Sequence, residues 1–361
     1  MSLPFTFLIH TAGGLLDAIR SNNQSRDLKK LMKPTQLKDD KSPKVLVTGA
    51  SGFIGRVLCQ QLVANSITHF RLFRPSHKNR IDAEEQFSTN IIFGDLLDLP
   101  SLRAACKDID IIIHSAGIAH VFEASKKTGR NINKNGTSLL LRAALKEGVK
   151  RFIYVSSSLA DQKKNHRRND SAYANDKRAA ESQILDAACE KKIEAIILRP
   201  VNVYGVGMKG NLFNLVRLIN TGFMPRLPKL DGKFSLVSAN DVAAALTLAL
   251  DCKLTEPQVL TLTDGHTYTI NEIEVQLRKA NNLKLPLIKL PATLVLLGFI
   301  MIAILTKLRL LKSNIGLKTY KNLTHTNELS NLKAQEILGF KPSTSFYELL
   351  PEITDTIRNQ S

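Results

Sequence analysis

The stretch that most restricts the fold is the run "KVLVTGASGFIGRVLCQQLVA" from Lys44 to Ala64. Its first part has the pattern of a buried strand, and its last part has the apolar spacing of an amphipathic helix. Gly49, Gly52 and Gly55 stand between them. Glycines at such a junction let the backbone turn tightly and approach a phosphate group, which rests against the helix N-terminus. An ordinary tight turn is the plainer alternative, but the three features together favour a phosphate-binding turn.

Strands and helices alternate beyond this turn. The strand patterns are "HFRLFR", "TNIIFGD", "IDIIIHSAG", "RFIYVSS" and "EAIILRP", and helix patterns such as "SLRAACKD" and "NGTSLLLRAALKEGV" separate them. Short apolar strands that alternate with helices are typical of an α/β protein with a parallel, doubly wound sheet. We therefore predict a dinucleotide-binding core over residues 44–200.

The segments on either side of this core have a different character. After Pro200 the pattern loosens, which predicts a smaller C-terminal α/β substrate-binding part over residues 201–361; "TINE" (269–272) fits a capping box there. Residues 1–43 are predicted to be an N-terminal extension and linker without chemistry. Their apolar start lacks a basic region and a clear cleavage site, so it makes a poor signal peptide, and Met32 is an alternative start.

Composition restricts the partners and the compartment. With 361 residues, 43% of them hydrophobic, the chain can form one large or two smaller domains. The four cysteines form no C-x-x-C pair, so we expect neither a disulfide framework nor a thiolate metal site, and a reducing cytosol fits. The net charge of +18 indicates an anionic partner: nucleotide phosphates, anionic lipid or nucleic acid. No zinc finger, RNP-like motif or helix-turn-helix is evident, so nucleic acid is not the predicted partner.

The strongest hydrophobic run is "LPATLVLLGFIMIAILT", residues 290–306, flanked by Lys289 and Lys307. It contains no charge but is slightly short for a bilayer span, which needs about 20 residues. We predict a buried or interfacial helix rather than a true span. The acid-free basic segment 307–321 would suit an anionic membrane surface, so contact with the inner face of the membrane is a further hypothesis.

The end of the second strand pattern predicts which dinucleotide binds. An NAD site would place an Asp or Glu about twenty residues beyond the glycines. Here "FRLFRPS" has Arg71 and Arg74 instead, and Arg56 follows the last glycine. The planar guanidinium suits a 2′-phosphate, so NADP(H) is favoured over NAD(H), with Arg74 as the main candidate. Asp95 in "FGDL" is placed to meet the adenine, although an aspartate at a strand end also forms turns.

The run "SAYANDKRAAE" places Tyr173 four residues before Lys177 in a predicted helix. At that spacing the two side chains lie on one helical face. They could form an acid/base pair in which the lysine cation lowers the pKa of the phenol. Because this spacing is common, a solvated helix is the better interpretation of the run on its own.

Several motifs occur together and in a recognisable order: the glycine turn, "FGDL", "HSAG", "NKNGT", "FIYVSSS", Tyr173 with Lys177, "LRPVNVYG" and "LGFKP". From about Lys44 to Leu350 the chain resembles the extended short-chain dehydrogenase/reductases, specifically their NAD(P)-dependent nucleotide-sugar epimerase/dehydratase/reductase family. The resemblance implies a Rossmann fold. In detail, the sequence most resembles reductases and epimerases of bacterial surface-polysaccharide pathways.

The resemblance implies a role for each matching residue. Tyr173 would exchange the proton of a sugar hydroxyl, Lys177 would bind the nicotinamide ribose, and Ser157, with Ser158 as its rival, would bind the same sugar oxygen. Asn133 would brace the site. The cofactor-lining residues would be Gly49, Ser51, Gly52, Phe53, Ile54, Gly55, Arg74, Asp95, Leu96, Ser115, Ala116 and Gly117, together with Tyr173 and Lys177.

On the substrate side, Asn202 and Asn211 match positions that contact a nucleotide-sugar, with Ser158 and Asn133 beside them. Three departures bear on this side. Phe234 stands where many relatives have an arginine for the diphosphate, so Lys233 or Arg226 is the candidate substitute. The loop between Ser157 and Tyr173 is short and basic, and Ala172 replaces a common proline.

The implied activity is hydride transfer at a sugar carbon. The absent acid and Arg74 favour NADPH-dependent reduction of a C4 keto group over 4-epimerisation with tightly bound NAD; a dehydratase would need a second acid in "SLADQ". A non-catalytic NADP-binding scaffold is the other class of hypothesis, and a lipid-linked sugar is an alternative substrate to a UDP-sugar. A homodimer and a cytoplasmic location, with or without membrane contact, complete the expectations.

Overall fold

The computed structural model describes residues 42–76, 90–118, 131–161, 171–308, 320, 324 and 326–358, which lie in a compact unit from Pro43 to Ser361 apart from Ser42. Predictions about residues 1–41, the basic loop 162–170 and most of 309–325 fall outside these ranges.

Seven parallel strands form the central sheet, in the order β3-β2-β1-β4-β5-β6-β9. β1 pairs with β2 on one side and with β4 on the other, so that Val47 lies opposite Arg71 of β2 and Ile113 of β4. The predicted doubly wound α/β sheet is therefore confirmed. Its strands are β1 (Val45–Thr48), β2 (His69–Phe73), β3 (Asn90–Phe93), β4 (Ile111–His114), β5 (Arg151–Val155), β6 (Glu194–Pro200) and β9 (Gln258–Leu262).

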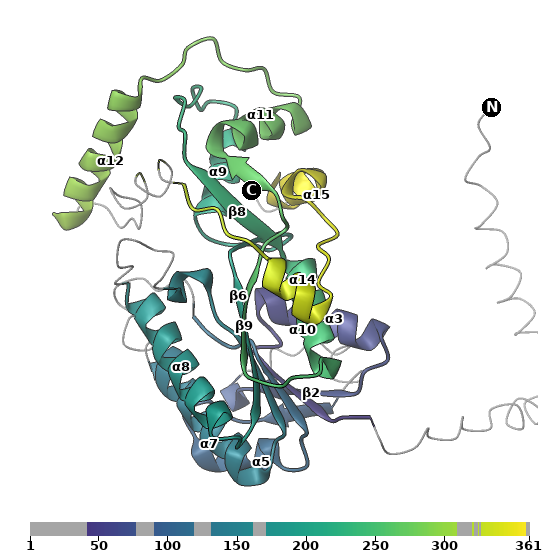
Figure 1. Ribbon diagram of the computed structural model, residues 1–361. Coiled ribbons are helices and arrows are strands. Elements are labelled where there is room, and N and C mark those ends of the chain that lie inside the picture. The colour runs from purple at the N-terminus through teal and green to yellow at the C-terminus, as the bar shows by residue number, and fades with distance from the viewer. Residues whose placement is uncertain are drawn as a thin grey trace, which may run out of the picture. The chain divides into compact units, whose positions relative to one another are not determined.

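Helices cover both faces of this sheet (Figure 1). Val45 and Val47 point into one core, with α3 (Phe53–Ala64), α10 (Ala239–Asp251) and α14 (Leu332–Leu338). Leu46 points into the other core, with α5 (Leu99–Cys106), α7 (Thr137–Glu147) and α8 (Ala172–Cys189). Because both faces are covered, the strands are apolar at successive positions, which is why they appear in the sequence as continuous hydrophobic runs.

A second, three-stranded sheet lies in the C-terminal half, in the order β10-β8-β7. Tyr204, Tyr268 and Phe346 are buried in its core, and both tyrosine hydroxyls donate to Asp264 Oδ2, at 2.9 and 2.6 Å. The predicted capping box is confirmed: Thr269 and Glu272 bond each other's backbone N–H. The elements are β7 (Asn202–Tyr204), β8 (Lys233–Ser238), β10 (Thr267–Thr269), α9 (Asn211–Asn220), α11 (Ile270–Ala280) and α15 (Phe346–Arg358).

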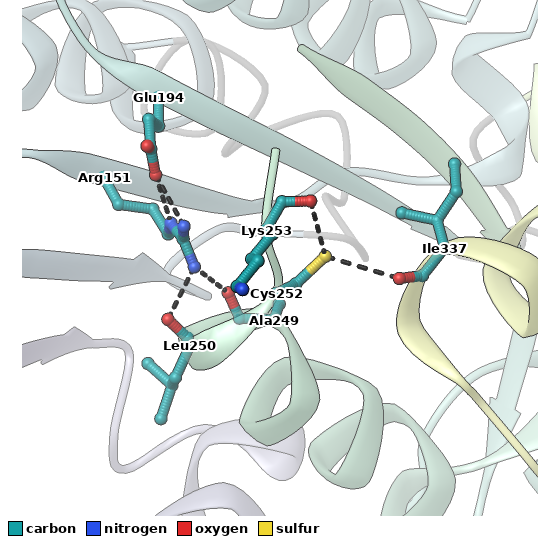
Figure 2. Close-up of polar contacts among 7 residues, drawn as sticks. All are labelled: Arg151, Glu194, Ala249, Leu250, Cys252, Lys253 and Ile337. Atoms are coloured by element: carbon teal, nitrogen blue, oxygen red, sulfur yellow. Dashed lines mark hydrogen bonds and ion pairs between the residues drawn. The ribbon is translucent and has the colours of Figure 1, made fainter. Parts of the chain in front are cut away.

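The C-terminal half is fastened to the main sheet by its strand β9 and by polar contacts at the amino ends of the strands (Figure 2). Arg151 at the start of β5 donates two bonds to Glu194 at the start of β6, and its Nη1 donates to the last carbonyls of α10, those of Ala249 and Leu250. Cys252 Sγ contacts the carbonyl of Ile337 in α14 at 3.4 Å. The division of the chain at residue 200 stays a prediction, since strands on both sides of it share one sheet.

The hydrophobic run forms helix α12 (Ala292–Lys307). None of its residues is buried, so the alternative of a buried core helix is wrong. The run lacks the one-sided polar face that would have revealed which side packs on the protein. Among the described residues, no helix is both long enough and apolar enough to cross a membrane.

Candidate active site

The turn between β1 and α3 requires glycine at two positions. Gly49 has φ +77°, and a Cβ there would lie 2.6 Å from the backbone nitrogen of Ala116. A Cβ on Gly55 would lie 2.0 Å from the carbonyl oxygen of Gly49. Real Cβ atoms essentially never come so close, so only glycine permits the helix to start this close to the strand.

The N-terminus of α3 has the features of an anion site. Gly52 provides no side-chain cap, and the first turn carries no acidic residue. Ser51 is exposed beside it, while Phe53 and Ile54 are half-buried at the start of the helix. A helix N-terminus with open backbone donors favours a phosphate. The glycine cradle and this helix end therefore fit a dinucleotide pyrophosphate.

The turn after β4 brings the next predicted residues to the same end of the sheet. Ser115 Oγ donates to the carbonyl of Thr48 at 2.7 Å, which ties this turn to β1. A Cβ on Gly117 would lie 3.2 Å from Asn133 Oδ1 and 3.4 Å from Lys177 Nζ. The absence of a side chain at Gly117 thus lets an asparagine and the lysine come close to the backbone.

The buried side chain of Asn133 holds the turn after β4 in place. Its Oδ1 accepts from the N–H of Ile118 at 2.8 Å, and its Nδ2 donates to the carbonyl of Ile118 at 3.0 Å. Asn133 lies in a π-helix, Asn131–Gly136, that precedes α7 and was not predicted. A π-helical turn at this point offers the side chain to a neighbouring loop, as such turns often do at functional sites.

The ends of β2 and β3 hold the residues predicted to choose the cofactor. Arg74 follows β2 directly and is half-buried, with no acidic residue among the described residues 74–76. Arg71 is buried, its guanidinium 5.6 Å from the ring of Phe73. Asp95 Oδ1 accepts from the N–H of Leu97 at 2.8 Å, so this carboxylate does form a turn; its adenine contact stays a prediction, as does that of the buried Leu96.

Tyr173 and Lys177 lie in the first turns of α8, which Ser171 caps by accepting from the N–H of Ala174. Lys177 Nζ donates to the carbonyl of Val155 at 2.8 Å and lies 6.0 Å from the centroid of the Tyr173 ring. Ser157, just past β5, hydrogen-bonds the Tyr173 side chain. The predicted serine, tyrosine and lysine therefore converge at the carboxyl ends of the strands, next to the glycine turn.

Burial dominates the protonation of this pair. Burial raises the pKa of Tyr173 to about 12, although the hydrogen bond from Ser157 lowers it in part. Burial also lowers the pKa of Lys177 to about 8. In the protein alone the pKa of the phenol is therefore not near neutral, because removal of the phenolate from water costs more than its neighbours return.

Comparison with known proteins agrees with this arrangement. The sequence pattern of the NAD dependent epimerase/dehydratase family matches residues 45–262, which include the glycine turn, Tyr173 and Lys177. The chain belongs to this family.

A curated relative and two solved structures resemble this chain over much of its length. A UDP-glucose 4-epimerase of Vibrio cholerae is 29% identical over 252 residues, 65% of this chain and 75% of the relative. The structure of RMD from Pseudomonas aeruginosa complexed with NADPH has a TM-score of 0.63, at 21% identity, and covers 89% of this chain and 99% of that one. A UDP-glucose 4-epimerase from Thermus thermophilus in complex with NAD has a TM-score of 0.64, at 20% identity, covering 88% and 100%.

The structure adds Glu181 to the site of this epimerase/dehydratase family member. It follows Lys177 by four residues on the same face of α8 and is buried. Its carboxylate hydrogen-bonds Ser156 and receives two bonds from Arg199, at 2.9 and 2.6 Å, while Arg199 also pairs with Asp161 at 3.6 Å. The negative charge of Glu181 raises the pKa of Lys177 against the larger effect of burial. The i, i+4, i+8 spacing of Tyr173, Lys177 and Glu181 was the signal that could have found it.

His114, from the "HSAG" motif, was also missed. It is fully buried between the hydroxyls of Thr48 and Thr137, at 2.6 and 2.9 Å, and stacks on Tyr154. Burial first, and the nearby Lys177 charge second, lower its pKa to about 3. The neutral side chain of His114, in β4, therefore links β1 and α7 through its two hydrogen bonds.

The predicted substrate-side residues are spread over separate elements. Asn202 is exposed on β7, Asn211 is exposed at the first turn of α9, and Ser158 is half-buried in a short 3-10 helix, Ser158–Ala160. Because they lie on three different elements, their shared role in binding a substrate stays a prediction. Phe234 is half-buried and packs against the core of the three-stranded sheet. It lies opposite Tyr268 of β10, which agrees with an apolar role at that position.

Cys59, Cys106, Cys189 and Cys252 form no disulfide bond in the described part of the chain, which also contains no cluster of His, Cys, Asp or Glu that could hold a metal ion.

Proposed function

We propose that this protein is an NADPH-dependent reductase of a C4 keto group on a nucleotide-sugar. The observation that carries the proposal is the convergence of Tyr173 with Ser157, which hydrogen-bonds it, and with Lys177, which is fixed on the Val155 carbonyl; the phenol is protonated at neutral pH, and burial raises its pKa to about 12. A protonated phenol is ready to donate to a forming alkoxide, which is the proton that reduction consumes.

Each residue of the site has a defined part in that reaction. Tyr173 donates its proton to the carbonyl oxygen, and Ser157 holds the same oxygen and the phenol in line. Lys177, fixed on the Val155 carbonyl, provides a positive charge that stabilises the phenolate left behind. The cofactor, when bound, supplies the hydride.

The glycine cradle and α3 would hold the pyrophosphate, and Arg74 would hold a 2′-phosphate. This assignment is supported by the place of Arg74 directly after β2 and by the lack of an acid among residues 74–76, which an NAD site would use to bind the ribose hydroxyls. The preference for NADPH over NADH rests on that residue. The nucleotide is proposed to be uridine diphosphate, because the Vibrio cholerae relative is named for a UDP-sugar.

A 4-epimerase is the second candidate, and the same relative favours it. An epimerase removes a hydride and returns it, so it keeps its NAD bound and consumes none. A reductase uses one reduced cofactor for each turnover and must exchange it.

The decisive experiment is a cofactor titration of the purified protein, with NADPH against NADH and a check for nucleotide that co-purifies. A preference for NADPH of about tenfold or more, with little nucleotide retained, supports the reductase; in Arg74→Ala this preference should vanish. Tightly retained NAD(H) with no effect of the 2′-phosphate would establish the epimerase instead.

A second experiment separates an enzyme from an NADP-binding scaffold. Tyr173→Phe should lower turnover of a 4-keto nucleotide-sugar by about 10²–10⁴-fold and leave NADPH affinity unchanged. Tyr347→Phe is the matched control, because the Tyr347 hydroxyl is buried and no residue in the described part of the chain hydrogen-bonds it. Activity that survives in Tyr173→Phe would remove the proposed proton donor.

A further inference from the structure

Helix α12 presents an apolar stripe to solvent. Leu294, Leu297, Met301 and Ile304 each expose more than half of their surface, and their spacing of three or four residues puts them on one face. Figure 1 shows α12 set apart from the other labelled helices. A surface helix of a soluble protein normally packs its apolar residues against its own core, and these four are instead exposed.

The other face of α12 is the one against the protein. Val295, Leu296 and Phe299 are only half-exposed, and the ring of Phe299 lies 5.6 Å from that of Tyr320. The helix is thus held with a definite side outward.

A second group of exposed apolar side chains lies on the two chain segments before α12. Phe223 and Ile288 are 93% and 76% exposed, and Leu287 is fully exposed. These segments are joined where the N–H of Arg226 donates to Ile288 and the N–H of Leu290 donates to Arg226, at 3.3 and 2.9 Å. Such large apolar side chains rarely point into water without a partner.

The charges along the chain from residue 275 to 308 have one sign. Lys279, Lys284, Lys289 and Lys307 are all exposed, and no Asp or Glu occurs between residues 275 and 308. We call the four α12 stripe residues, with Phe223, Leu287 and Ile288, the apolar patch. Lysines stand at both ends of its helix, and the segment 275–308, which carries all of its residues except Phe223, contains no carboxylate.

We propose that the apolar patch docks on an anionic lipid bilayer. A helix of 16 residues is about 24 Å long, short of the roughly 30 Å hydrocarbon core, so α12 would lie in the interface with its stripe in the acyl region. The lysines at its ends would meet anionic headgroups. A second copy of the chain would bring the same lysines against these, so charge complementarity favours lipid. This inference is independent of the proposed reaction.

The test is sedimentation of the full chain with vesicles of phosphatidylcholine alone and with about 30% phosphatidylglycerol. The protein should pellet with the anionic vesicles and be released by salt. Replacement of Lys284, Lys289 and Lys307 by glutamine should lower the partition coefficient about a hundredfold, since each lysine near an anionic surface contributes a factor of about five. Glutamine at the equally exposed Lys146, Lys253 and Lys341 is the matched control.

A second set of variants tests the apolar contact. Leu294→Gln, Leu297→Gln and Met301→Gln together should abolish pelleting without lowering the thermal midpoint, because these side chains are already in solvent. Wild-type protein that stays in the supernatant with anionic vesicles would overturn the proposal. So would a stripe variant that pellets as before, or one that only converts a dimer to a monomer in light scattering, which would assign the patch to a second copy.

Discussion

Lys177 is the residue on which burial, charge and hydrogen bonding meet. Its buried ammonium group donates to the Val155 carbonyl, lies 4.6 Å from the centroid of the Tyr154 ring and is attracted by the charge of Glu181. The site therefore holds a cation whose solvation the protein only partly replaces, and folding must offset that cost.

The cost of Lys177 predicts a pH dependence of stability. Its pKa is about 8 in the folded chain against an ordinary 10.5, so between these values the unfolded chain binds the additional proton and stability rises with pH. From pH 8 to pH 10 we expect Lys177 to add about 2 kcal/mol to the free energy of unfolding. Above pH 10 the raised pKa of Tyr173 opposes this, because the unfolded tyrosine ionises first.

The measurement is urea denaturation at pH 8, 9 and 10 for wild type and Lys177→Met. The rise should be absent in the variant and unchanged in Lys146→Met, whose lysine is exposed on α7. Equal slopes in all three proteins would contradict the assignment.

At the scale of elements, the turn from β1 into α3 depends on close backbone contact. Gly55→Ala places a methyl group 2.0 Å from the Gly49 carbonyl, so α3 must move away from β1. We expect NADPH affinity to fall more than tenfold in calorimetry. Gly298→Ala, where the added Cβ meets nothing within 4 Å, should bind as wild type does.

Arg151 joins three elements at the opposite ends of the strands, as Figure 2 shows. Arg151→Met leaves the last carbonyls of α10 and the Glu194 carboxylate without their donor, and we expect a loss of about 2–3 kcal/mol of stability with unchanged KM. Arg103→Met removes an ion pair whose arginine is half-exposed, and should cost less than about 1 kcal/mol. A large change of KM in Arg151→Met would show that substrate binding at the active site depends on this end of the sheet.

The sequence was informative where local pattern and tertiary environment agree. The strand runs, the glycine turn, the Thr269 capping box and the order of the motifs all predicted what the structure contains, because each depends on residues close together in the chain. The protonation of Tyr173 and the inclusion of Glu181 depend on burial by distant elements, so the Tyr-x-x-x-Lys spacing alone did not predict the raised pKa of the phenol. The outward side of α12 could not be predicted either, since its residues are apolar all round.

At the scale of the whole molecule, the compact unit begins at Pro43. The hypothesis that the N-terminal extension carries no chemistry therefore has a direct test. A chain that starts at Ser42 should keep the thermal midpoint within about 2 °C and the NADPH affinity within twofold. Loss of either would assign the extension a part in the fold or the site.

The placement of β9 has a consequence for how this protein can be divided. The chain leaves the sheet after β6, forms β7 and β8 of the smaller sheet, returns as β9 directly beside β6, and then leaves again to add β10, so residues 201–257 are inserted between two neighbouring strands. A fragment that stops at Pro200 would expose the unpaired β6 edge, with Ile196, Ile197 and Leu198, and should aggregate rather than fold. The smaller sheet is thus connected to the main sheet by three chain crossings, between β6 and β7, between β8 and β9, and between β9 and β10, and any motion that closes it over a sugar must bend all three.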